Sequence, residues 1–146
     1  MDEKKVTPAS QKSVWLAVLC MSIGAAVIAV AAGLISVSPE NFNAPRSIVG
    51  LAGFVFFVAG TSLLMPANSA WRAGMAAIIL IAMASIGYWV ALVADPADIS
   101  GGLPFLDKTD NAQLGKWVFG VGALITSGMA GYAVKDFWKK LSLKRR

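Results

Sequence analysis

The residues that could do chemistry in this chain are few, and the most concentrated group is acidic. Asp95, Asp98, Asp107 and Asp110 lie in the segment 95–116, which separates two long apolar runs. Carboxylates are ligands that Ca²⁺ prefers, but these four do not have the spacing of a calcium-binding loop. We therefore interpret them as solvated loop residues and not as a cation site.

Catalysis and cofactor binding lack their usual residues. The chain has no histidine and one cysteine, Cys20, so it does not supply the ligands of a structural zinc site, a histidine-ligated haem or a cysteine-ligated iron–sulfur cluster. A nucleophilic serine needs a neighbouring base, and the apolar runs contain neither histidine nor carboxylate. We expect a protein that is not an enzyme and that holds no cofactor or metal. Cys20 is interpreted as a buried packing residue.

The apolar runs dominate the composition. Hydrophobic residues make up 57% of the chain and charged residues 14%, whereas soluble domains have about 25% charged residues. No charge falls inside 14–37, 47–65, 73–94 or 117–134, and a membrane helix needs about 20 such residues. The first run is longer than the core of a signal peptide, so we expect it to be retained. The sequence therefore predicts an all-α integral membrane protein with four transmembrane helices.

The basic residues fall mainly on one side of this arrangement. Residues 1–13, the connection 66–72 and the tail 135–146 would share a side with ten Lys or Arg, and the loops 38–46 and 95–116 would share the other with three. Because short basic segments stay in the cytoplasm, we predict cytoplasmic termini in an antiparallel up-and-down bundle of the bacterial inner membrane. This bias, and not a nucleic-acid partner, explains the net charge of +5. All five tryptophans lie near predicted span ends, where tryptophan is enriched.

Small residues recur every four positions on the first and fourth spans. They are Ala25, Ala29 and Gly33 in the first span and Ala123, Ser127 and Gly131 in the fourth. Small residues let helix backbones approach closely in lipid, so we predict that these two faces meet. Hydroxyls within the spans, including Ser85 and Thr126, are expected to bond to a carbonyl one turn earlier or to a neighbouring helix. We favour helix packing over a substrate site for all of them.

The loops carry further expectations. The short connection 66–72 makes spans two and three neighbours, with Asn68 or Ser69 as the cap of the third helix. In the acidic loop, Leu103 and Phe105 are expected to fold back onto the outer rim of the bundle.

Arg46, at the outer end of the second span, is a basic residue on the side that carries few. Two interpretations stay open. The side chain either extends to the membrane surface without a partner or forms an ion pair with a loop acid such as Glu40.

The C-terminal segment KDFWKKLSLKRR (135–146) combines charge with an apolar strip. If it is helical, Phe137, Trp138 and Leu141 lie close together at i, i+3 and i, i+4 spacing. The flanking basic residues are Lys135, Lys139, Lys140, Lys144, Arg145 and Arg146. Each basic residue near an anionic leaflet contributes about 1 kcal/mol of attraction. We favour a simple topology anchor, with contact to membrane lipids or to a partner as the alternative.

The segment FNAPRSIVGLAGFVFFVAGTSLLM (42–65) resembles part of small uncharacterised four-helix bacterial membrane proteins. In size and number of spans the chain is also similar to the small membrane subunits of tripartite tricarboxylate transporters, and a likeness of this kind implies no activity. We predict a non-enzymatic accessory or structural subunit of a larger membrane complex or a homo-oligomer. The alternative is a transporter or channel subunit that contributes to a substrate path. Uncharged, unbroken spans favour the first.

Overall fold

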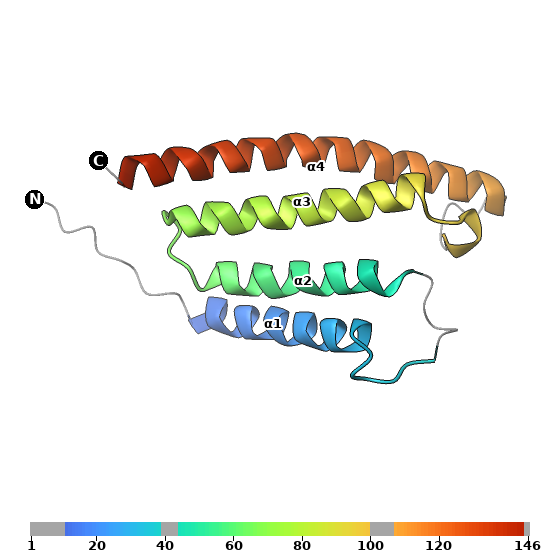
Figure 1. Ribbon diagram of the computed structural model, residues 1–146, viewed down its shortest axis with the longest axis horizontal. Coiled ribbons are helices and arrows are strands. Elements are labelled where there is room, and N and C mark those ends of the chain that lie inside the picture. Colours follow the sequence, from blue (N-terminus) through green and yellow to red (C-terminus); the bar gives the residue numbers. More distant parts are fainter. Residues whose placement is uncertain (1–10, 39–43, 100–106, 145–146) are drawn as a thin grey trace, which may run out of the picture.

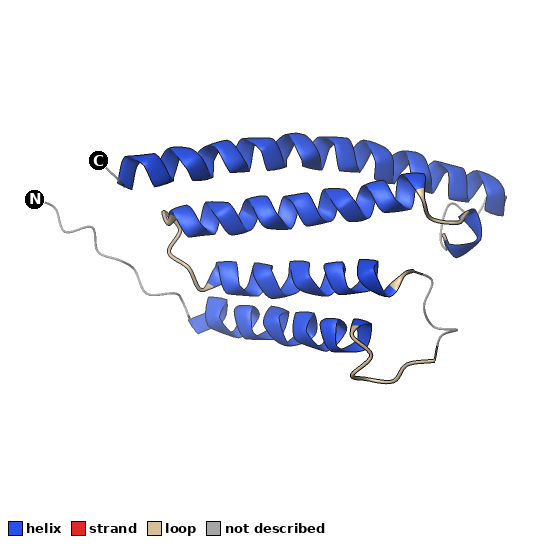
Figure 2. Cartoon of the chain, viewed as in Figure 1, coloured by secondary structure: helices blue, strands red, loops and turns tan. Residues whose placement is uncertain are grey.

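The computed structural model describes residues 11–38, 44–99 and 107–144, and it is helical (Figures 1 and 2). In chain order the elements are α1 (Gln11–Ala31), α2 (Arg46–Leu63), α3 (Ala70–Leu92), the short 3₁₀ helix η2 (Pro96–Asp98) and α4 (Lys108–Lys144). All four α-helices are long and apolar enough to cross a membrane. The prediction of an all-helical protein with four helices of spanning length is confirmed.

The four helices lie side by side in chain order and form an open layer (Figure 1). α1 packs on α2, α2 on α3, and α3 on α4, whereas the described parts of α1 and α4 do not contact each other. The contacts within the α1–α2 and α3–α4 pairs are extensive, and the contact between α2 and α3 is much smaller. The molecule therefore consists of two helix pairs joined along a narrow seam.

The two ends of the layer differ in charge. The start of α1, the connection between α2 and α3, and the end of α4 lie at one end, which we name the basic end (Figure 1). Its described charged residues are Lys12, Arg72, Lys135, Asp136, Lys139, Lys140 and Lys144. Those of the opposite end are Arg46, Asp95, Asp98, Asp107, Lys108, Asp110 and Lys116. Charge is thus polarised along the helix axes.

The apolar run 14–37 does not stay helical to its end. α1 stops at Ala31, and Gly33 follows with a φ of 77°. The N–H of Leu34 donates to the Ala29 carbonyl at 2.9 Å, as in the Schellman motif that closes many helices. Glycine adopts this left-handed conformation at little cost, so Gly33 ends the helix. The prediction of one helical span over 14–37 is wrong beyond this turn.

Glycines allow the close contact between α1 and α2. A Cβ atom on Gly24 of α1 would lie 2.5 Å from the backbone nitrogen of Phe57 and 2.6 Å from the carbonyl oxygen of Gly53. A Cβ atom on Gly60 would lie 2.7 Å from the Ala17 carbonyl oxygen. The two backbones therefore touch at positions where no side chain fits between them. Contacts of this kind are typical of helices that associate in lipid.

The described part of the protein buries small side chains and exposes large ones. Its buried apolar residues are Val58 and alanines such as Ala77 and Ala82. Large apolar side chains, including Leu124 and Phe56, point outward along the helices. Contiguous exposed apolar surface is rare on soluble monomers and is typical of surfaces that contact lipid or protein.

Gly24→Ala is expected to destabilise the α1–α2 pair by about 1 to 3 kcal/mol. The added methyl group overlaps backbone atoms of α2, which cannot move aside as a flexible side chain could. Thermal unfolding in detergent micelles, followed by circular dichroism, measures the effect. The matched control is Gly131→Ala on α4, where a Cβ atom would have no heavy atom within 4 Å and alanine has the higher helix propensity. Equal melting temperatures for the two variants would contradict the α1–α2 contact.

Candidate functional site

The predicted packing residues of α1 lie beside the true contact face. Ala25 is exposed, Ala29 is half-buried, and Gly33 lies in the turn after the helix. The face that contacts α2 carries Ala17 and Gly24, both buried. The prediction that the stripe of α1 meets α4 is wrong, because α1 and α4 lie at opposite edges of the layer and make no described contact (Figure 1).

The predicted packing residues of α4 lie along its side toward α3, and they differ in how closely they pack. Ala123 is buried, and a Cβ atom on Gly87 of α3 would lie 3.0 Å from its Cβ. Gly131 is exposed and lines an open pocket between α3 and α4, where a Cβ atom would meet no heavy atom within 4 Å. α4 therefore uses part of the predicted stripe, but its partner is α3.

Ser127 links α4 to Tyr88 of α3 through hydroxyl groups. Its Oγ lies 2.8 Å from the Ala123 carbonyl oxygen and 3.2 Å from the Tyr88 phenol oxygen. Serine has one hydroxyl hydrogen and a carbonyl only accepts, so Ser127 donates to Ala123 and Tyr88 donates to Ser127. The predicted hydroxyl bonds to a carbonyl one turn earlier are also present at Ser85 and Thr126.

The basic C-terminal segment continues α4 without a break through Lys144. The helix has 37 residues, or about 55 Å at the usual rise, whereas the hydrocarbon core of a bilayer is about 30 Å thick. Its last turns therefore extend beside the start of α3 at the basic end (Figure 1). Arg145 and Arg146 lie outside the described residues, as does the side chain of Lys144.

The apolar strip of the tail has two destinations. A Cβ atom on Gly74 of α3 would lie 3.1 Å from ring carbons of Phe137, so this ring packs on α3. Leu141, one turn further, is half-buried beside the α2–α3 connection. Trp138 is 62% exposed, and its ring meets that of Phe137 edge-on at 5.9 Å. Phe137 thus holds the tail against α3, Leu141 is half-buried, and Trp138 is left on the surface.

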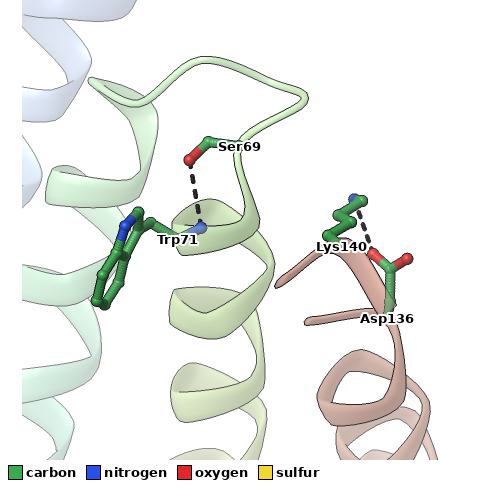
Figure 3. Close-up of polar contacts among 4 residues, drawn as sticks. All are labelled: Ser69, Trp71, Asp136 and Lys140. Carbon is green, nitrogen blue, oxygen red and sulfur yellow. Dashed lines mark hydrogen bonds and ion pairs between the residues drawn. The ribbon is translucent and has the colours of Figure 1, made fainter. Parts of the chain in front are cut away.

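The basic residues of the tail are solvent-accessible to different degrees. Lys135 and Lys139 are exposed, whereas Lys140 is half-buried and lines a pocket between α4 and the start of α3. The Nζ atom of Lys140 lies 2.8 Å from Oδ2 of Asp136, one turn earlier (Figure 3). Because these two side chains are 38% and 36% exposed, the ion pair contributes little to stability.

Ser69 caps α3 as predicted. Its Oγ accepts the backbone N–H of Trp71 at 3.2 Å (Figure 3). The indole of Trp71 points away from Lys140 in the same view and is 65% exposed.

A pocket of about 480 Å³ lies between this cap and the last turns of α4. Its lining residues are Asn68, Ser69, Ala70, Trp71, Lys140, Leu141 and Leu143. The spacing of residues in the tail could not identify it, since much of the lining comes from the α2–α3 connection and the start of α3.

Arg46 at the opposite end begins α2 and reaches back to α1. A Cβ atom on Gly33 would lie 3.3 Å from its Nη1 atom. A guanidinium there lies beside the carbonyl-rich end of a helix, where positive charge is favourable. Glu40, one of its predicted partners, lies outside the described residues.

The acidic loop is described only in part. The Oδ1 atom of Asp95 accepts the N–H of Ala97 at 2.9 Å and caps η2. Leu103 and Phe105, predicted to fold onto the rim, lie outside the described residues. Within 11–38, 44–99 and 107–144, no three cysteine or acidic side chains are grouped as metal ligands would be. Cys20, predicted to be buried, is half-buried in α1.

Comparison with known proteins gives no relative for this chain. No family model matches it, and neither the curated proteins nor the solved structures provide a match. Its function is therefore argued from the contacts and charges described above.

The contact between Phe137 and Gly74 is testable by crosslinking. In a Cys20→Ser background, Gly74→Cys combined with Phe137→Cys is expected to form a crosslink with a short thiol-reactive reagent. Mobility on a denaturing gel reports it. The control pair, Gly74→Cys with Trp138→Cys, should react several-fold less, because Trp138 is turned to the surface. Equal yields from the two pairs would contradict the packing of the tail on α3.

Proposed function

We propose that the protein is a multi-pass protein of the bacterial inner membrane, with four antiparallel transmembrane helices and cytoplasmic termini. The polarity of charge supports this orientation, because the basic end has six basic residues and one acidic residue in the described chain, and the opposite end has three basic and four acidic residues. Short basic segments remain cytoplasmic. The exposed apolar side chains supply the surface that faces lipid.

Within the membrane, we propose a non-enzymatic role as an accessory or structural subunit of a larger complex or of a homo-oligomer. The observation that carries this proposal is the open layer: among the four described α-helices, α1 packs on α2 alone and α4 on α3 alone, and the seam between α2 and α3 is narrow. A Cβ atom added to Gly122, Gly128 or Gly131 of α4 would have no heavy atom within 4 Å. Such positions allow another helix to approach closely.

A transporter or channel subunit is the second candidate. The described helices of one chain do not close around a central path, because α1 and α4 are not in contact. A path would therefore lie between this chain and another subunit. The runs 47–65, 73–94 and 117–134 contain no charged residue, whereas ion-coupled carriers keep charges at membrane depth. The accessory role is the better supported of the two.

Native mass measurement after gentle extraction tests the accessory role. The chain is expected to be recovered with a larger membrane subunit or as an oligomer. Gly128→Leu should release it as a monomer that keeps its helix content by circular dichroism, because the new side chain enters space that this chain leaves open. Met129→Leu, which keeps the volume of an exposed neighbour, is the control. A monomer from the parent protein would contradict the proposal.

Orientation is tested by single cysteines in a Cys20→Ser background. We expect an impermeant thiol reagent applied to intact cells to label Thr109→Cys and not Asn68→Cys or Ser142→Cys, since only the first lies at the end opposite the basic end. Permeabilised cells should label all three. Labelling at position 68 or 142 in intact cells would contradict the proposed cytoplasmic location of the basic end.

A further inference from the structure

We propose that the pocket at the basic end binds the headgroup of one anionic phospholipid of the cytoplasmic leaflet. The pocket lies between the cap of α3 and the last turns of α4. The inference rests on the proposed function, because it requires the basic end to lie at the membrane surface. It goes beyond a general attraction between the basic tail and anionic lipids, because it assigns one lipid to one pocket.

The lining of the pocket fits an amphiphile. Lys140 supplies a cation, and the Asn68 amide and the Ser69 hydroxyl supply hydrogen-bond donors. The Ser69 oxygen accepts the N–H of Trp71, and its own hydrogen is available to a phosphate oxygen. Leu141 and Leu143 line the same space with apolar surface. A soluble phosphate would contact only the polar lining residues. A phospholipid would place its phosphate against the polar residues and its glycerol-linked chains against the two leucines.

The charge around the pocket favours an anion. Arg72, Lys135 and Lys139 lie at the same end as Lys140. Asp136 pairs with Lys140 at 2.8 Å, but one contact of this kind engages one of the three ammonium hydrogens. An exposed pair is also weak. The Lys140 ammonium can therefore bind a phosphate oxygen while it stays near Asp136.

The position of the pocket along the helices matches the depth of lipid headgroups. α3 begins at this point, directly after the Ser69 cap. The exposed Trp71 indole lies on the side of α3 away from Lys140 (Figure 3), and tryptophan is enriched at the level where headgroups meet hydrocarbon. The volume of about 480 Å³ is within the usual range of small-molecule sites. One headgroup is the occupant of the right size, charge and depth.

Native mass spectrometry of the full-length protein, titrated with phosphatidylglycerol or with phosphatidylcholine, tests the site. We expect one tightly bound phosphatidylglycerol. Lys140→Gln should weaken it about tenfold, because it removes a charged hydrogen bond to the phosphate that only a lysine lining the pocket can make. Lys139→Gln removes the same charge from an exposed neighbour that does not line the pocket, and should change binding less than twofold. Asp136→Asn should strengthen binding, because it frees Lys140.

Two results would overturn the site. Equal weakening by Lys140→Gln and Lys139→Gln, or equal binding of the two lipids, would mean diffuse attraction only. Displacement of the bound lipid by an equal concentration of glycerol 3-phosphate would assign the pocket to a soluble phosphate compound instead. Failure of the proposed membrane location has a separate signature, since alkaline carbonate would then release the parent protein from membranes whatever the lysine variants do.

Discussion

The close approach of helix backbones at glycine is the interaction on which the layer depends. In a lipid bilayer, the location we propose for this chain, burial of apolar side chains does not drive helices together, and packing and hydrogen bonds must do so. Gly24 against Gly53, and Gly87 against Ala123, bring backbone and methyl atoms into direct contact. Many small dispersion gains then add up along each pair. The contact between α2 and α3 is much smaller, so the fold consists of two tight pairs and one weak seam.

α4 is long enough to continue from the α3–α4 pair into the basic end. The segment from Lys108 to Lys144 contains no proline, so nothing in the sequence forces the helix to stop where the apolar run stops. Phe137 then reaches Gly74 of α3, and Trp138 beside it turns to the surface. The basic tail is consequently held in one place relative to α3. The pocket lined by both helices lies next to that contact, toward the end of α4.

The sequence predicted the helices better than it predicted their partners. Charge-free runs of spanning length are a local signal, and all four produced helices. The choice between Gly24 and the adjacent Ala25–Ala29 stripe is not local, because a helix rich in small residues offers several such faces and the facing glycines of α2 decide among them. The end of α1 depended on the left-handed turn at Gly33. The tail strip was recognisable, but its destination was set by Gly74, in another helix.

A layer one helix thick constrains what this protein can do. Its described core consists of alanine and Val58, and within the described residues the α1–α2 and α3–α4 pairs meet through the small α2–α3 contact. A second protein or a second copy packed against the seam, as we propose for this chain, would add helix contacts that hold one geometry. An enzyme or an autonomous carrier needs its groups held in fixed positions, and in the proposed assembly the partner supplies that rigidity. For this reason we propose a subunit of an assembly and not a solitary protein.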